Sequence, residues 1–224
     1  GHAARFAMDS AWGERILKDK GSILVLPGDL PLMPASLIEQ MLAPLGRGES
    51  LRLLTCELPD PTGYGRVVRK GRKGSVLRIV EQKDASDREK SICEVAASIY
   101  LFQASFLKVG LSRLSDKNAQ GEYYLTDLIA QASRGKKKID VLCWSDAEDL
   151  RGVNDPWELS QADGILNFRT VRDWARRGVR FIDPQSTRLD VHVQLDEEVV
   201  VHPGAILTGN TRVARGAQIG PRVV

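Results

Sequence analysis

The feature of this sequence that most suggests chemistry is a carboxylate that directly follows an apolar run. Residues 22–26, Ser-Ile-Leu-Val-Leu, lead into Pro27, Gly28 and Asp29. Such a run predicts a strand buried on both faces of a parallel α/β sheet, and open α/β sheets bind ligands beyond the carboxyl ends of their strands. There Asp29 could hold a hard cation such as magnesium beside a phosphate, and Gly28 would let backbone and ligand approach closely. An ordinary Gly-Asp turn is the alternative.

Composition and charge exclude several classes of function. The chain has 224 residues, with 32 basic against 29 acidic side chains, and this weak balance argues against nucleic-acid binding. No apolar segment reaches the length needed to span a membrane, and the start shows no signal peptide. The cysteines Cys56, Cys93 and Cys143 are far apart in the sequence. They are expected to be buried, reduced thiols of a cytoplasmic protein.

Strands and helices are expected to alternate through residues 1–155, which predicts an α/β domain. From Asp155-Pro156 onward the apolar residues recur at helical spacing, which predicts a long linker helix within residues 156–180. The expected strands cover residues 22–27, 51–58, 67–68, 76–80, 92–102 and 139–144, and the expected helices 1–20, 34–42, 104–113 and 122–133.

The end of the chain is a repeat. From Leu189 it divides into six hexads, whose first position is always aliphatic and whose fifth is always small or β-branched. Hexapeptide periodicity predicts a β-helix over residues 181–224, with the first position of each hexad in its interior. Chance alternation in a β-rich tail is the alternative. Because the repeat stops without a cap, we expect the sequence to be truncated at its C-terminus.

Several long motifs are similar to those of one bacterial enzyme family. The sequence resembles the bifunctional N-acetylglucosamine-1-phosphate uridylyltransferase/glucosamine-1-phosphate acetyltransferases. The resemblance implies a Rossmann-like nucleotidyltransferase domain without its N-terminal part, a linker helix, and the start of a left-handed parallel β-helix that belongs to the acetyltransferase. The motifs are Gly28–Leu32, Asp60–Arg66 (DPTGYGR), Ile79–Ala85, Asn118–Asp127 (NAQGEYYLTD) and Gly152–Asn154.

The resemblance also implies a reaction and a set of site residues. A uridylyl group would pass from UTP to N-acetylglucosamine 1-phosphate, giving UDP-N-acetylglucosamine and pyrophosphate. Asp29, the catalytic residue, and Asn154 would hold Mg²⁺, and the substrates would also contact Gly28, Gly65 and Glu81. The attacking phosphate oxygen is already an anion, so the reaction needs alignment and charge neutralisation rather than a general base.

The family implies partners as well. Acetyl-CoA would be the co-substrate of the C-terminal domain in the parent enzyme, which contributes to cell-wall and lipopolysaccharide synthesis. The β-helix would form a homotrimer in the cytoplasm, with neither nucleic acid nor membrane as a partner.

Two departures from the family pattern leave alternatives open. The glycine-rich phosphate loop, expected upstream of Gly1, is absent, so the sequence is expected to be truncated there also and to be inactive by itself. Ala96 stands where the family has an asparagine that helps to bind the sugar. An ADP-glucose or GDP-mannose type of pyrophosphorylase therefore remains an alternative. A non-catalytic, trimeric β-helix assembly module is another.

Overall fold

The computed structural model describes residues 1–71 and 74–224, which form two compact units, Gly1–Arg151 and Gly152–Val224. Among the described residues, no helix combines the length and the apolar character that crossing a membrane requires. Arg72 and Lys73, which lie between the expected strands at residues 67–68 and 76–80, are outside the described residues.

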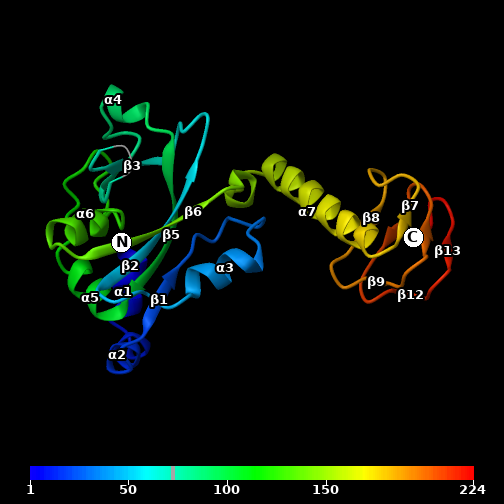
Figure 1. The fold of residues 1–224 in the computed structure, drawn as a ribbon, viewed down its shortest axis with the longest axis horizontal. Coiled ribbons are helices and arrows are strands. Elements are labelled where there is room, and N and C mark those ends of the chain that lie inside the picture. The colour runs from blue at the N-terminus through cyan, green and yellow to red at the C-terminus, as the bar shows by residue number, and fades with distance from the viewer. Residues whose placement is uncertain (72–73) are drawn as a thin grey trace. The chain divides into compact units, whose positions relative to one another are not determined.

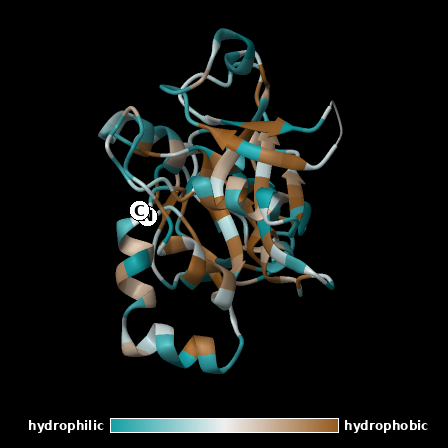
Figure 2. Ribbon diagram, turned by 90° about the vertical axis from the view of Figure 1, so that its left-hand side faces the viewer, coloured by the Kyte–Doolittle hydropathy of each residue, from teal (hydrophilic) through white to brown (hydrophobic). Residues whose placement is uncertain are grey.

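The first unit is built on a six-stranded mixed sheet, which confirms the α/β prediction. The strand order is β4-β3-β5-β2-β6, and β1 pairs with the same long strand β5 that also pairs with β3. Hydrophobic residues gather along these strands, whereas the surrounding loops are largely hydrophilic (Figure 2). The strands are β1 (Ser22–Val25), β2 (Glu49–Glu57), β3 (Gly65–Arg69), β4 (Val76–Val80), β5 (Glu94–Gln103) and β6 (Lys138–Trp144).

Helices cover both faces of the sheet, with α5 and α6 on one side and α3 on the other (Figure 1). Alternate residues of β2 serve the two sides, since Leu53 packs in the core with α5 and α6, and Leu54 in the core with α3. The helices are α1 (His2–Met8), α2 (Ala11–Lys18), α3 (Ala35–Leu42), α4 (Asp87–Lys90), α5 (Ala104–Leu111), α6 (Asp127–Arg134) and the 3₁₀ helix η1 (Ala147–Leu150).

The prediction for the apolar run at residues 22–27 is wrong in two respects. Strand β1 is antiparallel to its partner β5, and its residues are half-buried or exposed rather than buried on both faces. The strands with two buried faces are β2 and β5, which have neighbours on both sides. Among the described strands of this sheet, only β2 and β6 pair in parallel.

The expected helix over residues 1–20 is two helices, α1 and α2. The chain breaks at Asp9-Ser10 because the Ser10 side chain caps the second helix, accepting from the Gly13 amide at 3.4 Å.

The second unit begins with the long helix α7 (Pro156–Arg176), as predicted. Asp155 caps its first turn, accepting from the Glu158 amide at 2.8 Å. Gly178, with a φ of +97°, follows its end. Two-residue strands then follow: β7 (Arg180–Phe181), β8 (Arg188–Leu189), β9 (Gln194–Leu195), β10 (Val200–Val201), β11 (Ile206–Leu207), β12 (Arg212–Val213) and β13 (Gln218–Ile219).

These short strands follow the hexad repeat. Each of β8, β9 and β10 pairs in parallel with the strand three hexads later, so that Val201 lies beside Ile219. The first residue of each hexad was predicted to lie in the interior, and in five hexads this residue is buried. These five residues share one core with Val171 of α7: Leu189, Leu195, Val201, Leu207 and Val213.

The expectation of three buried thiols is correct only for Cys56, which is 2% exposed. Burial raises the pKa of this thiol to about 11. Cys93 and Cys143 are exposed. Cys93 precedes β5. Cys143 lies on β6, an edge strand that has only β2 as a neighbour among the described strands.

Candidate functional site

Gly28 and Asp29 lie in the loop that follows β1, and both are exposed. The Asp29 carboxylate has no hydrogen-bond or ion-pair partner among the described residues. A Cβ atom added to Gly28 would meet no heavy atom within 4 Å, and the residue does not have a positive φ. Neither residue is therefore needed for packing or backbone conformation, which leaves the carboxylate available to a ligand.

Gly65, the first residue of β3, is buried and lies directly against Glu81. A Cβ atom at Gly65 would lie 3.2 Å from Glu81 Oε2 and only 2.8 Å from Ile79 Cγ2. The glycine thus lets the carboxylate approach the backbone of the sheet. Two of the residues that the sequence predicted to bind substrate are neighbours in the structure.

Glu81 follows β4 and is half-buried. Its Oε1 accepts a hydrogen bond of 2.8 Å from the Thr126 hydroxyl. The side chain therefore has one oxygen held by the protein and the other beside Gly65. Burial, and then the negative charge of Glu81, raise the pKa of the nearby Tyr100 phenol.

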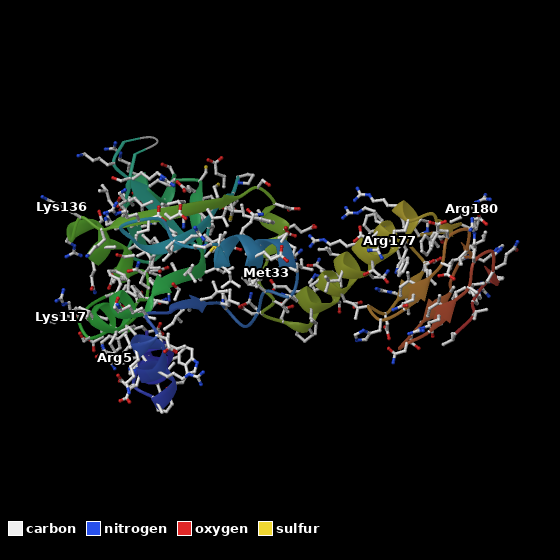
Figure 3. All side chains as sticks on the ribbon, turned by 60° about the horizontal axis from the view of Figure 1, so that its bottom comes forward. Arg5, Met33, Lys117, Lys136, Arg177 and Arg180 are labelled. Atoms are coloured by element: carbon white, nitrogen blue, oxygen red, sulfur yellow. The ribbon has the colours of Figure 1, made fainter. Side chains whose placement is uncertain are left out.

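Helix α1 supports the segment that carries Thr126. The Arg5 guanidinium, labelled in Figure 3, lies 4.6 Å from the centre of the Tyr123 ring and donates to the Leu111 carbonyl at 2.6 Å. The His2 ring also meets Tyr123 edge-on, at 5.0 Å between ring centres. These contacts fix the chain just before Thr126, the start of α6 and the partner of Glu81.

A row of small side chains crosses the sheet beside Gly65. Gly65 pairs with Ala96 of β5, and Ala96 pairs with Thr55 of β2, so the three residues face the same side. Ala96 is only 3% exposed, so its methyl group is enclosed. The buried Thr55 hydroxyl has no partner among the described residues.

Asn154 belongs to the second unit and is fixed by Glu158. Its backbone and side-chain N–H groups both donate to Glu158 Oε2, at 2.7 and 3.1 Å. The Asn154 side-chain oxygen accepts no hydrogen bond from the described residues and could serve as a metal ligand. Because Asp29 and Asn154 lie in different units, their pairing at one metal ion stays a prediction.

No group of three or more histidine, cysteine or acidic side chains forms a metal site within residues 1–71 and 74–224. A carboxylate and an amide oxygen nevertheless suit Mg²⁺, which usually keeps several water ligands and takes others from substrate phosphates. A cleft of about 1300 Å³ lies elsewhere, between the β3–β4 hairpin and residues 86–94. None of the predicted site residues lines it.

Sequence reasoning missed two residues that support the site. Thr126 holds Glu81, and the buried Arg66 binds both the loop before Gly65 and the residue after Glu81. Both belong to the long motifs quoted above, but nothing in a motif shows which of its polar residues meet in space.

Comparison with known proteins finds relatives that match nearly all of this chain over less than half of their own length. The chain is 41% identical to "Bifunctional protein GlmU" of Corynebacterium efficiens over 222 residues, which are 99% of this chain and 44% of that protein. Proteins of the same name from Corynebacterium jeikeium and Streptomyces coelicolor are 39% and 35% identical, again over 99% of this chain and 44–45% of theirs. No family model matches.

Among solved structures, a CMP:2-keto-3-deoxy-manno-octonic acid synthetase complexed with CTP is 16% identical, with a TM-score of 0.48. The match covers 68% of this chain and 65% of the synthetase. The family resemblance therefore rests on the sequence relatives, of whose length the chain spans about 44%. The motif resemblance is confirmed: over nearly its whole length, the chain is similar to one segment of the bifunctional GlmU proteins.

Proposed function

We propose that the first unit is part of a magnesium-dependent uridylyltransferase, which joins UTP and N-acetylglucosamine 1-phosphate into UDP-N-acetylglucosamine and releases pyrophosphate. The observation that carries this proposal is the contact between Gly65 and the carboxylate of Glu81, held in place by Thr126. A carboxylate fixed in this way accepts hydrogen bonds from sugar hydroxyls in a constant direction. The names of the sequence relatives support the same class of enzyme.

Asp29 and Asn154 would hold the Mg²⁺ ion through a carboxylate and an amide oxygen. When bound, the ion would neutralise negative charge on the phosphates of both substrates. The Asn154 side-chain N–H group donates to Glu158, which leaves the amide oxygen of Asn154 free to accept. Asp29 makes no hydrogen bond or ion pair with the described residues. Gly28 leaves space for a ligand at the same loop.

The residues of this chain need only bind and align the reactants. The nucleophile is a phosphate oxygen that is already charged, so no residue has to remove a proton from it. Glu81 would orient the sugar, while the backbone at Gly65 lets the sugar lie close to the sheet. Sugar phosphate and nucleotide would thereby meet in line at the α-phosphorus.

The second unit would begin a left-handed parallel β-helix. Its short strands pair three hexads apart, as the three-sided coil of such a helix requires. By the family resemblance, this β-helix would belong to an acetyl-CoA-dependent acetyltransferase and would form a homotrimer. We expect the whole enzyme to act in the cytoplasm.

The complete gene product, supplied with UTP, Mg²⁺ and N-acetylglucosamine 1-phosphate, is expected to release pyrophosphate. Asp29→Ala should abolish this turnover with an unchanged melting temperature, because an exposed, unpartnered carboxylate adds nothing to the core. Turnover only with ATP and glucose 1-phosphate, or with GTP and mannose 1-phosphate, would contradict the proposed substrates. No turnover in any combination would contradict the proposed class.

A further inference from the structure

Arg66 is the largest fully buried side chain of the described protein, with 1% of its surface exposed. Among the described residues, its hydrogen-bond partners are neutral groups. Its Nη1 donates to the Tyr64 carbonyl, and its Nη2 donates to Gln82 Oε1 at 2.6 Å. The Nε atom is buried and has no hydrogen-bond partner among the described residues.

Other arginines of the sheet differ from Arg66 because each has a carboxylate partner. Arg52 pairs with Asp140, and Arg69 binds Glu94 through two hydrogen bonds of 2.6 Å. No carboxylate of the described residues lies within 4.0 Å of Arg66.

One acidic side chain does respond to the Arg66 charge. The pKa of Asp60 is lowered, mainly by hydrogen bonds from Thr62 and to a smaller extent by Arg66. Asp60 is exposed, so water screens this attraction. A buried charge without a close counter-ion is costly, and a bound anion lowers that cost.

The contacts of Arg66 connect it to both sides of the candidate site. Tyr64 immediately precedes Gly65, and Gln82 immediately follows Glu81. Gln82 Oε1 also accepts from the Gly63 amide at 3.3 Å, so this one oxygen joins Arg66 to the turn before Gly65. The guanidinium therefore lies beneath the backbone that carries the proposed substrate contacts.

We infer that Arg66 is a positioning residue that makes this site selective for phosphate-bearing ligands, through its buried, uncompensated positive charge. The inference rests on the proposed function and extends it, since it concerns the charge of the ligand rather than the identity of its sugar. A charge in a low-dielectric surrounding acts on an anion over several ångströms and is weakly screened by salt. A neutral sugar gains nothing from it.

Gln82→Glu is the sharpest test because the new side chain has nearly the same shape. A carboxylate at this position keeps both acceptor contacts, to Arg66 and to Gly63, but neutralises the guanidinium. The dissociation constant of the complete protein for UDP-N-acetylglucosamine should rise about three- to tenfold, as expected for one unit charge in a partly screened site. Weak binding of uncharged N-acetylglucosamine, followed by NMR, should not change.

Three further variants complete the test. Arg66→Lys keeps the charge and should bind UDP-N-acetylglucosamine more tightly than Arg66→Met. Arg78→Gln is the matched control, because Arg78 lies on the neighbouring strand, is 45% exposed and is paired with Glu89. Its removal should leave the dissociation constant within about twofold of the wild type.

The possible failures are distinguishable. If the wild type binds UDP-N-acetylglucosamine and Gln82→Glu binds it equally well, the inference about Arg66 is wrong and the proposed function stands. The same conclusion follows if Gln82→Glu weakens the charged and the neutral ligand equally, since the effect would then be structural. If the wild type binds no UDP-sugar, the proposed function itself fails.

Discussion

At Gly65 the absence of one carbon atom allows a carboxylate to lie against the sheet. The added Cβ would come within 2.8 Å of Ile79 and 3.2 Å of Glu81, and neither neighbour can move freely. Ile79 is only 6% exposed, and Glu81 is held by Thr126. Gly28, by contrast, has open space around it. Packing therefore requires a glycine at position 65 but not at position 28.

Gly65→Ala should lower the free energy of unfolding by about 1–3 kcal/mol, as overpacking of a core typically does. Gly28→Ala is the control and should stay within about 0.5 kcal/mol of the wild type, since nothing contacts the new methyl group. Urea denaturation of the two variants measures both values. Equal stability losses at the two positions would show that the close contact at Gly65 is not real.

The sequence predicted the carboxylate and glycine positions of the site but not what holds them. Asp29 was predicted from its place after an apolar run, and Gly65, Glu81 and Asn154 from the family resemblance. The hydrogen bond between Glu81 and Thr126 joins residues far apart in the chain. Such a contact depends on the tertiary fold and leaves no local pattern.

At the scale of elements, a buried arginine ties helix α3 to the sheet. Arg52 of β2 donates to the carbonyls of Met41 at 3.0 Å and Ala43 at 2.6 Å, at the end of α3, and pairs with Asp140 of β6. Helix ends leave carbonyl groups without partners, so the guanidinium replaces a capping residue. The same charge also compensates Asp140.

Arg52→Met should therefore lower the free energy of unfolding by about 2–4 kcal/mol, because it leaves a partly buried carboxylate and several carbonyl groups unpaired. Arg78→Met, which breaks a more exposed ion pair with Glu89, should cost less than about 1 kcal/mol. Thermal unfolding with matched denaturant curves gives the comparison. A loss at Arg52 no larger than that at Arg78 would contradict the role assigned to it.

The first turn of α6 contains a carboxyl group whose pKa is raised. Burial is the main cause at Asp127, Arg134 opposes it, and Asp84 adds to it. The pKa of this carboxyl group is therefore higher in the folded state than in the unfolded state. The stability that the group contributes is fully present below the unfolded-state pKa and is lost as the pH rises through the folded-state pKa. Asp127→Asn cannot ionise and escapes this loss.

The melting temperature of Asp127→Asn, relative to that of the wild type, should therefore increase between about pH 3 and pH 7. Calorimetric scans across this range check the sign. A relative melting temperature that decreases over the range would mean that ionised Asp127 stabilises the fold.

Local sequence patterns predicted most helices and strands, but they gave the wrong pairing and burial for strand β1. The helix α7 and the hexads were predictable because their apolar spacing is regular over many residues. The apolar run of β1 resembles a central strand, yet the structure places it antiparallel beside β5. Which strands flank a strand is a property of the whole sheet, so the run alone could not determine its burial.

At the scale of the whole molecule, the chain has separate cores in its two units. The cores around Leu53 and Leu54 belong to the first unit, and the core around Val199 and Val201 belongs to the second. A core with its own buried residues can unfold on its own. Damage to one core should therefore remain local.

Val199→Asp should unfold the second unit, since it buries an unpaired charge at a position with 0% exposure. Hydrogen exchange followed by mass spectrometry should show lost protection in Arg180–Ile219 and preserved protection in β2 and β5. The exposed neighbour Glu198 provides the control, because Glu198→Asp should leave exchange unchanged in both units. Simultaneous loss of protection in both units would show that the molecule folds as one cooperative body.

The most direct test of the central claim is to locate the bound sugar nucleotide. Amide resonances of the complete protein would be followed by NMR as UDP-N-acetylglucosamine and Mg²⁺ are added. Saturable shifts are expected at Gly28, Asp29, Gly65, Glu81 and Asn154. Saturable binding that instead shifts only residues around the cleft of Arg69 and Glu94, or no binding at all, would contradict the site proposed for this protein.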